Sequence, residues 1–288
     1  MGSKSVVLVL GATGMLGSAV LRLLAQSPGY SVIGSVRSSD AVQLLPSALH
    51  GHIISGINVH DMDSVIHLFD RARPNIVINC VGLVKQLAGG NDPLAALPVN
   101  SLFPHRLLQL CKVARTRLIH VSTDCVFDGA KGMYTESDVA DAKDTYGLSK
   151  YLGEVHDPQA ITLRTSIIGP ELNSAHGLVG WFLEQSDGVK GFTRAIFSGL
   201  TTVELARVMR DFIIPRADLS GLYHVSAEPI SKHDLLLLLA HEYGSSVDIV
   251  PDGKLIIDRS LDSRRFREHT SYVPPSWPQL VRVMHEFG

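Results

Sequence analysis

The sequence has few cysteines and lacks a metal-binding pattern. Its three cysteines, Cys80, Cys111 and Cys125, are an odd number and show no CxxC spacing. These features argue against a disulfide framework and a structural zinc site, and they favour a reducing compartment. The 13 histidines are scattered and form no HExxH motif, so no metal site is predicted.

The sequence also lacks a block of Lys and Arg and a long hydrophobic run. The formal net charge is -2 and the sequence pI is about 6.7. No basic cluster could neutralise a phosphate backbone, so nucleic acid is not an expected partner. The first apolar run, residues 6–10, is too short for a signal-peptide core or a membrane span. We therefore expect no membrane partner and, by default, a cytoplasmic location.

The sequence does contain a regular alternation of short β-rich runs and segments of helical period. The expected strands cover residues 6–10, 31–37, 53–58, 75–81, 118–122 and 161–165, and the expected helices cover 15–25, 61–73 and 98–114. This alternation predicts an α/β fold with a doubly wound parallel sheet of the Rossmann type, covered on both faces. A hydrophobic content of 45% over 288 residues allows a sizeable core.

The pattern changes after Gly169-Pro170. Shorter elements follow, with helices over 178–185, 202–214 and 232–243, strands over 222–225 and 247–250, and a last helix that Ser276 caps with Pro278 in its first turn. We therefore divide the chain into a dinucleotide-binding domain with the catalytic residues, 1–169, and a smaller C-terminal α/β substrate lobe, 170–288. Some elements of the second part are expected to return to the first domain, and the two parts are expected to share a cleft.

A glycine-rich turn follows the first strand and opens the first helix. It reads Gly11-Ala-Thr-Gly14-Met-Leu-Gly17. In this context the first glycine makes the turn, the second admits main-chain N–H groups to a pyrophosphate, and the third allows helix and strand to pack closely. The predicted dinucleotide contacts in this segment are Gly11, Thr13, Gly14, Met15, Leu16 and Gly17.

Residues near the ends of the next strands complete the expected cofactor site. Arg37 lies about 20 residues past the turn, where an acidic residue would bind the ribose 2′-hydroxyl of NAD and where an Arg favours a 2′-phosphate. We therefore expect NADPH/NADP⁺ in preference to NAD(H). The other expected cofactor contacts are Asn58 and Val59 near the adenine, and Cys80, Val81 and Gly82 near the nicotinamide and its ribose.

Three further residues point to hydride chemistry. Tyr146 and Lys150 are four residues apart, so on a helix they share one face. A cation beside a phenol stabilises its anion and moves the phenol pKa from about 10 toward the working range of a general acid. Thr123 lies in Ser122-Thr123-Asp124 at the end of the fifth strand, the edge where ligands of open α/β sheets bind. We predict Thr123, Tyr146 and Lys150 as the catalytic set.

The order of these motifs resembles the extended short-chain dehydrogenase/reductase family, and more narrowly its dTDP-4-dehydrorhamnose reductase branch, which acts on nucleotide-linked sugars. The resemblance covers nearly the whole chain and is strongest over residues 1–170. It rests on the glycine-rich turn and on Ser122-Thr-Asp-Cys-Val-Phe-Asp-Gly129, Tyr146-Gly-Leu-Ser-Lys150 and Leu163-Arg-Thr-Ser-Ile-Ile-Gly169. It implies an NADPH-dependent oxidoreductase that reduces a 4-keto nucleotide-deoxysugar in nucleotide-sugar and polysaccharide biosynthesis.

The same resemblance implies roles for individual residues. Thr123 would position the keto oxygen, Tyr146 would donate the proton, and Lys150 would support the phenol and bind the nicotinamide ribose. Asn100 matches a family position associated with a proton-relay water. The expected substrate contacts are Val84, Asn100, Thr123, Asp124, Cys125 and His176. A nucleotide sugar is the expected partner, and a homodimer is a possible assembly.

Two other functions stay open. Cys125 stands where the reductase branch often carries an aromatic residue, and with His176 it resembles the pair that moves protons next to the sugar carbonyl in GDP-fucose synthase. The first alternative is therefore a nucleotide-sugar epimerase or epimerase-reductase. The plainer interpretation makes Cys125 a small residue of the pocket wall and His176 a loop residue. The second alternative is a non-catalytic nucleotide-binding regulatory subunit on the same fold, against which the complete set Thr123, Tyr146 and Lys150 argues.

Overall fold

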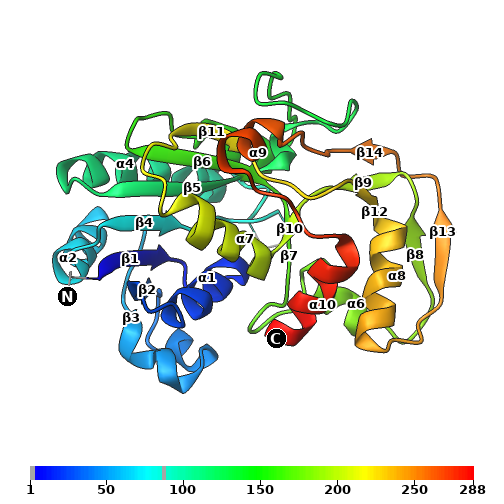
Figure 1. The fold of residues 1–288 in the computed structure, drawn as a ribbon, viewed down its shortest axis with the longest axis horizontal. Helices are drawn as coiled ribbons and strands as arrows, with labels where there is room; N and C mark the ends of the chain where they lie inside the picture. Colours follow the sequence, from blue (N-terminus) through cyan, green and yellow to red (C-terminus); the bar gives the residue numbers. More distant parts are fainter. Residues whose placement is uncertain (1–3, 86–88) are drawn as a thin grey trace.

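The computed structural model describes residues 4–85 and 89–288. Within them, the centre of the molecule is a seven-stranded sheet in the order β11-β6-β5-β4-β1-β2-β3 (Figure 1). Its strands are β1 (Ser5–Leu10), β2 (Tyr30–Ser35), β3 (Ile53–Ile54), β4 (Ile76–Asn79), β5 (Arg117–Thr123), β6 (Ala160–Thr165) and β11 (Gly221–His224). All neighbouring strands pair in parallel. The predicted doubly wound α/β fold is confirmed.

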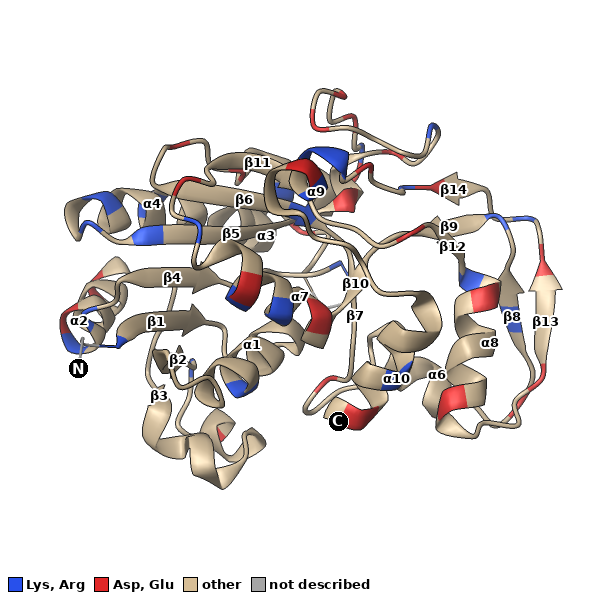
Figure 2. Cartoon of the chain, in the orientation of Figure 1, with Lys and Arg blue, Asp and Glu red and all other residues tan. Residues whose placement is uncertain are grey.

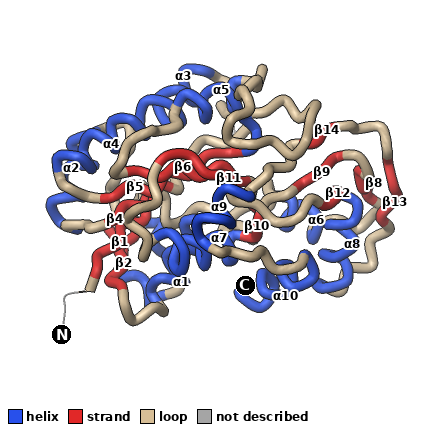
Figure 3. The backbone as a smooth tube through the Cα atoms, turned by 45° about the horizontal axis from the view of Figure 1, so that its top comes forward, coloured by secondary structure: helices blue, strands red, loops and turns tan. Residues whose placement is uncertain are grey.

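Helices cover both faces of this sheet. Helices α1 (Met15–Ala25) and α7 (Thr202–Val208) lie on one face, and α2 (Met62–Ala72), α4 (Phe103–Val113) and α5 (Thr145–Leu152) lie on the other (Figure 3). Each face of the sheet packs in its own hydrophobic core. Successive residues of β1 alternate between these two cores, with Val7 and Val9 in one and Leu8 and Leu10 in the other. Burial on both faces explains why the central strands read as continuous apolar runs.

Three strands of the main sheet end at least two residues earlier than predicted, among them β4, which ends at Asn79 and not at 81. β2 ends at Ser35 and β3 at Ile54, where the sequence predicted 37 and 58. Gly56 has a positive φ of 83°, which bends the chain out of the extended conformation soon after β3. Arg37 and Asn58 therefore lie in loops beyond the strand ends.

The helix expected over 98–114 begins earlier, at Pro93. It consists of α3 (Pro93–Ala96), the π-helical segment η3 (Leu97–Leu102) and α4. Asp92 caps it, since its carboxylate accepts a hydrogen bond from the Leu94 N–H at 3.0 Å. The π segment adds a residue to the helical turn, so the apolar spacing of three and four does not continue through it.

The later part of the chain builds a smaller layer beside the sheet (Figure 1). It contains β8 (Val189–Phe192), β9 (Ala195–Phe197), β12 (Ile230–Ser231), β13 (Ile249–Asp252), β14 (Ile257–Asp258), α6 (Leu178–Leu183), α8 (Lys232–Tyr243) and α10 (Trp277–Phe287). β7 (Ile167–Ile168) and β10 (Leu200–Thr201) pair between the two parts. β11 joins the main sheet beside β6, α7 packs on α1, and α9 (Arg264–Thr270) contacts β11. Ser276 and Gln279 form a capping box at the start of α10.

Charged residues of both signs are interspersed over the outer helices and loops, whereas the central strands are nearly free of them (Figure 2). Across residues 4–85 and 89–288, no helix combines the length and apolar character needed to cross a bilayer. The same residues contain no group of three or more His, Cys, Asp and Glu side chains arranged to hold a metal ion.

Candidate active site

A cavity of about 570 Å³ lies at the carboxyl ends of the main strands, facing the smaller layer. One wall comes from the loops after β1, β4, β5 and β6 and from α5. The opposite wall comes from residues 171–178, 195–197, 232, 257 and 259. Thr123, Tyr146 and Lys150 all line this cavity, so the structure brings the predicted catalytic set together.

The start of α1 forms one end of the cavity. Its N-cap, Gly14, makes no side-chain capping bond, and its first turn holds no acidic residue. Thr13, Gly14, Met15 and Leu16 line the cavity here. Free N–H groups at the positive end of a helix favour an anion, so these residues fit a dinucleotide pyrophosphate.

The other two glycines of the turn lie behind this wall. A Cβ on Gly17 would overlap the carbonyl oxygen of Gly11, so only glycine allows α1 to begin so close to the turn. This is the close packing that the sequence predicted for the third glycine.

The loop after β4 forms the next part of the wall. Cys80, Val81 and Gly82, which were expected near the nicotinamide and its ribose, line the cavity. A Cβ on Gly82 would lie 4.0 Å from Nζ of Lys150, so the loop backbone approaches the ammonium closely. Burial raises the pKa of the Cys80 thiol to about 12, and this side chain is therefore neutral at physiological pH.

Besides Gly11 and Gly17, four predicted residues are not among those that line the cavity: Arg37, Asn58, Val59 and Asn100. Arg37 and Asn58 are exposed in loops. Asn100 is buried, and its Oδ1 accepts from the Leu83 N–H at 2.8 Å while its Nδ2 donates to the Leu83 carbonyl at 2.9 Å and to the Ser149 hydroxyl at 3.0 Å. Because these bonds occupy its amide, Asn100 joins the loop after β4 to α5, and a direct substrate contact is not supported.

Helix α5 carries Tyr146 and Lys150 to the cavity. Asp144 caps it by accepting a hydrogen bond from the Gly147 N–H at 2.7 Å. A Cβ on Gly147 would overlap the carbonyl oxygen of Cys125, in the short 3-10 turn η4 (Asp124–Val126) that follows β5. Glycine at 147 therefore lets α5 touch the segment after Thr123. This packing role of Gly147 was not predicted, although a glycine directly after Tyr146 is a visible sequence signal of close backbone contact.

Thr123 is held at the end of β5 by local hydrogen bonds. Its hydroxyl accepts from the Cys125 N–H at 3.1 Å and donates to Oδ1 of Asp124 at 3.2 Å. Thr123 and Tyr146 both line the cavity, and the Thr123 hydroxyl is close enough to the phenol to oppose the rise of its pKa. Thr123 can donate to a substrate oxygen once its proton turns from Asp124.

The electrostatics of Tyr146 correct one prediction. Burial raises the pKa of the Tyr146 phenol, the nearby Cys125 and Asp124 raise it further, and only the Thr123 hydrogen bond opposes them appreciably. Lys150 is not among the groups that shift the Tyr146 pKa; its Nζ donates to the Val121 carbonyl at 2.7 Å. Burial also lowers the pKa of Lys150 to about 8. Tyr146 is therefore a neutral proton donor at physiological pH.

The opposite wall holds cations that the sequence analysis missed. Val84, Asp124, Cys125 and His176 line the cavity, as predicted. Arg259 and Lys232 line it as well; Nη1 of Arg259 lies 3.8 Å from Sγ of Cys125, and its Nε donates to the Phe127 carbonyl at 2.7 Å. No local sequence motif marks these two residues. Lys232 is at the start of α8 and Arg259 follows β14, so they come together only in the folded chain.

Comparison with known proteins identifies relatives of this chain. Residues 5–252 match the family described as the RmlD substrate binding domain. The "Probable low-salt glycan biosynthesis reductase Agl14" of Haloferax volcanii is 32% identical over 231 residues, which cover 76% of this chain and 74% of that protein. The dTDP-4-dehydrorhamnose reductase of Aggregatibacter actinomycetemcomitans is 26% identical over 247 residues, covering 82% and 78%.

Two other comparisons bear on function and fold. Methionine adenosyltransferase 2 subunit beta of Danio rerio is 27% identical over 252 residues, which cover 82% of this chain and 73% of that protein. The crystal structure of dTDP-4-dehydrorhamnose reductase from Bacillus anthracis in complex with NADP has a TM-score of 0.81 at 19% identity and covers 99% of both chains. The structural likeness establishes the same fold over the whole chain.

Proposed function

The chain belongs to the RmlD substrate binding domain family, the dTDP-4-dehydrorhamnose reductase-like branch of the extended short-chain dehydrogenases/reductases, and we propose that it reduces a 4-keto nucleotide-deoxysugar with NADPH. One observation carries the proposal. A single cavity holds Thr123, Tyr146 and Lys150 beside the uncapped start of α1. The relatives named as reductases support the same reaction class.

The cofactor supplies a hydride when bound. Backbone N–H groups of Thr13, Met15 and Leu16 would hold its pyrophosphate, since the Gly14 N–H donates to the Gly11 carbonyl, and residues 80–82 would contact its nicotinamide end. Arg37 would bind the 2′-phosphate. It is exposed beyond β2 and has no hydrogen bond or ion pair with any other residue in the described part of the chain, so its guanidinium is free to pair with an anion.

The catalytic set would act on the ketone oxygen. Thr123 and Tyr146 donate hydrogen bonds to it and polarise the carbonyl. As the carbonyl carbon is reduced, the Tyr146 O–H bond breaks and its proton forms the new hydroxyl of the product. Lys150 would stabilise the phenolate that remains if its ammonium turned from the Val121 carbonyl toward the phenol.

The cations of the opposite wall favour an anionic substrate. Burial lowers the pKa of Lys232, and Asp124 is the carboxylate that most opposes this effect. Burial raises the pKa of Asp124, and Arg259 and Lys232 are among the groups that oppose this rise, so one carboxyl faces two cations. The diphosphate of a nucleotide sugar would supply the missing negative charge to Lys232 and Arg259.

A direct assay tests the proposal. The purified chain is mixed with NADPH and a dTDP-linked 4-keto-6-deoxysugar, and we expect loss of NADPH absorbance together with the reduced sugar nucleotide in the mass spectrum. Deuterium from C4-labelled NADPH should appear on the former carbonyl carbon. Binding of both ligands without turnover would contradict the proposal and favour the non-catalytic regulatory subunit.

One observation favours epimerisation as a second candidate. Cys125 and His176 line the same cavity as the catalytic set. However, burial and Asp124 raise the pKa of the Cys125 thiol to about 12, so it is a proton donor and not a ready base. Reduction alone is therefore the function that the site supports best.

A further inference from the structure

A buried ion pair lies behind the cavity, between the end of α5 and the main sheet. Glu154 follows α5, and Arg164 is on β6. Nη2 of Arg164 lies 2.7 Å from Oε2 of Glu154, Nε donates to Oε1 at 2.7 Å, and the side chains are only 4% and 1% exposed. Because removing two charges from water is costly, an apolar pair of similar size is often as stable. The position of this pair suggests another role.

The same carboxylate is joined to the catalytic strand. The Ser122 hydroxyl donates to Oε1 of Glu154 at 2.7 Å. One residue earlier in β5, the Val121 carbonyl accepts from Nζ of Lys150 at 2.7 Å. Lys150 and Glu154 therefore hold consecutive residues of β5, directly before Thr123.

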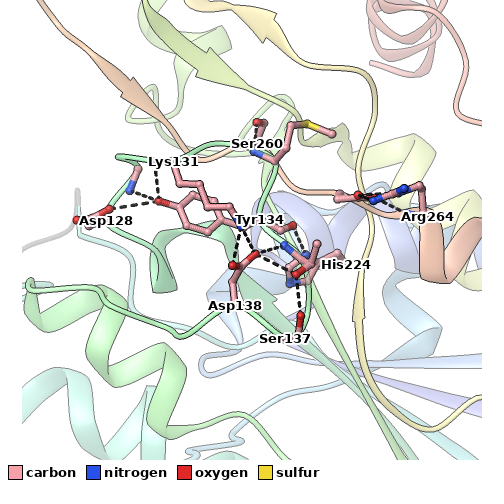
Figure 4. A network of polar contacts seen from close by, with 12 residues as sticks. Asp128, Lys131, Tyr134, Ser137, Asp138, His224, Ser260 and Arg264 are labelled. Atoms are coloured by element: carbon pink, nitrogen blue, oxygen red, sulfur yellow. Dashed lines mark hydrogen bonds and ion pairs between the residues drawn. The ribbon is translucent and has the colours of Figure 1, made fainter.

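Beyond Arg164, the polar contacts continue to the loop of residues 128–138. Nη1 of Arg164 lies 3.4 Å from Nε2 of His224, and Nδ1 of His224 donates to the Tyr134 carbonyl at 2.9 Å. Figure 4 shows His224 beside this loop, where Lys131 pairs with Asp138. Burial and Arg164 lower the pKa of His224 to about 3, so the imidazole is neutral and adds no charge to the ion pair.

We propose that Glu154 is a positioning residue that keeps Lys150 charged inside a desolvated site, with Arg164 holding its carboxylate in place. Around Lys150, the titratable groups are Tyr146 and Glu154 from the α5 segment, Cys80 after β4 and His120 in β5. Tyr146 and Cys80 are neutral because burial raises their pKa values, and His120 is neutral because burial lowers its pKa. Glu154 is the carboxylate that acts on the ammonium.

If Glu154 sets the charge of Lys150, replacing Glu154 and replacing Arg164 should shift the Lys150 pKa in different ways. Burial lowers the pKa of Lys150 to about 8, and Glu154 opposes this effect. Loss of the Glu154 charge should therefore lower the Lys150 pKa further. Loss of Arg164 breaks the same ion pair but removes a positive charge, so it should not lower that pKa. A merely structural ion pair predicts the same effect for both changes.

The test measures the Lys150 pKa directly in the free protein. Lysine labelled with ¹³C at Cε is followed by NMR against pH, and a Lys150→Met variant assigns the signal. We expect Glu154→Gln to lower the Lys150 pKa by about one unit. Arg164→Met should leave it unchanged or raise it. A lowering of similar size in both variants, or no change in Glu154→Gln, would overturn the inference.

Two further variants control for folding. Ser122→Ala removes the bond to Glu154 without changing a charge, so the Lys150 pKa should stay within a few tenths of a unit. The double variant Glu154→Gln/Arg164→Met leaves no unpaired charge behind and still removes the carboxylate. If one of the single variants does not fold, the double variant takes its place in the test and should still lower the Lys150 pKa. An unchanged Lys150 pKa in the double variant would contradict the inference.

The charge of Lys150 matters for catalysis only if the proposed function holds. The high-pH limb of kcat/KM should then move to lower pH in Glu154→Gln, in step with the NMR titration. A shifted Lys150 pKa with an unshifted pH profile would leave the Glu154 inference standing and would remove Lys150 from the proposed reaction.

Discussion

The two walls of the cavity are built in different ways. The wall near α1 and α5 consists of backbone in close contact, with glycines at 17 and 147 where a Cβ would overlap a carbonyl oxygen. The opposite wall consists of side chains from distant elements, including Lys232 and Arg259. The first wall has little freedom to vary and carries the groups for the reaction. The second carries the two cations that the proposed function assigns to substrate binding.

The largest expected effect belongs to the first wall. Tyr146→Phe removes the proton donor and keeps the ring, so turnover should fall by ~10²–10⁴-fold while NADPH affinity stays nearly intact. Steady-state kinetics and a fluorescence titration with NADPH measure the two quantities. Lys150→Ala is the matched comparison and should impair both. Near-normal ketone reduction by the Phe variant would show that Tyr146 is not the acid.

Cofactor choice should depend on Arg37, an exposed residue of the loop after β2 that does not line the cavity. A charge-assisted hydrogen bond contributes about 1.5–3 kcal/mol, so Arg37→Ala should weaken NADPH binding by roughly 10- to 100-fold and leave NADH little changed. Dissociation constants for both cofactors check this. Equal losses for NADPH and NADH would mean that Arg37 supports the loop and not a phosphate.

Substitutions in the opposite wall should change the KM for the substrate and leave kcat nearly unchanged. Lys232→Met should raise KM for the nucleotide sugar roughly tenfold with kcat nearly unchanged, because the substrate diphosphate would lose one charge-assisted hydrogen bond. The effect should shrink as salt is added. Lys254→Met, at an exposed position outside the cavity lining, is the control. A fall in kcat without a change in KM would contradict the division between the walls.

The smallest effect is expected at the junction of the walls. If Cys125 only lines the pocket, Cys125→Ser should cost less than tenfold in rate, which is about 1.4 kcal/mol or less in barrier. Turnover in D₂O should then give product without deuterium on the carbons beside the ketone. Deuterium there, lost in Cys125→Ser or His176→Gln, would establish epimerisation with reduction.

Local sequence patterns predicted the bounds of an element well where residues within that element specify where it begins and ends. The bounds of α1 and α8 agree with the predicted 15–25 and 232–243, because apolar spacing and terminal residues define both helices. The prediction was wrong at the ends of β2 and β3 and at the start of the helix before α4. There, a positive φ at Gly56 and a π-helical segment change the backbone without changing the apolar pattern.

The parallel sheet, the glycine turn and the shared helical face of Tyr146 and Lys150 could be predicted from local patterns, since each depends on neighbours within a few residues. The direction of the Tyr146 pKa shift, the hydrogen bonds of Asn100 and the approach of Lys232 and Arg259 to the cavity became visible only in the folded chain. Burial and charge at a site are sums over residues that lie far apart in the chain, and no local pattern records them.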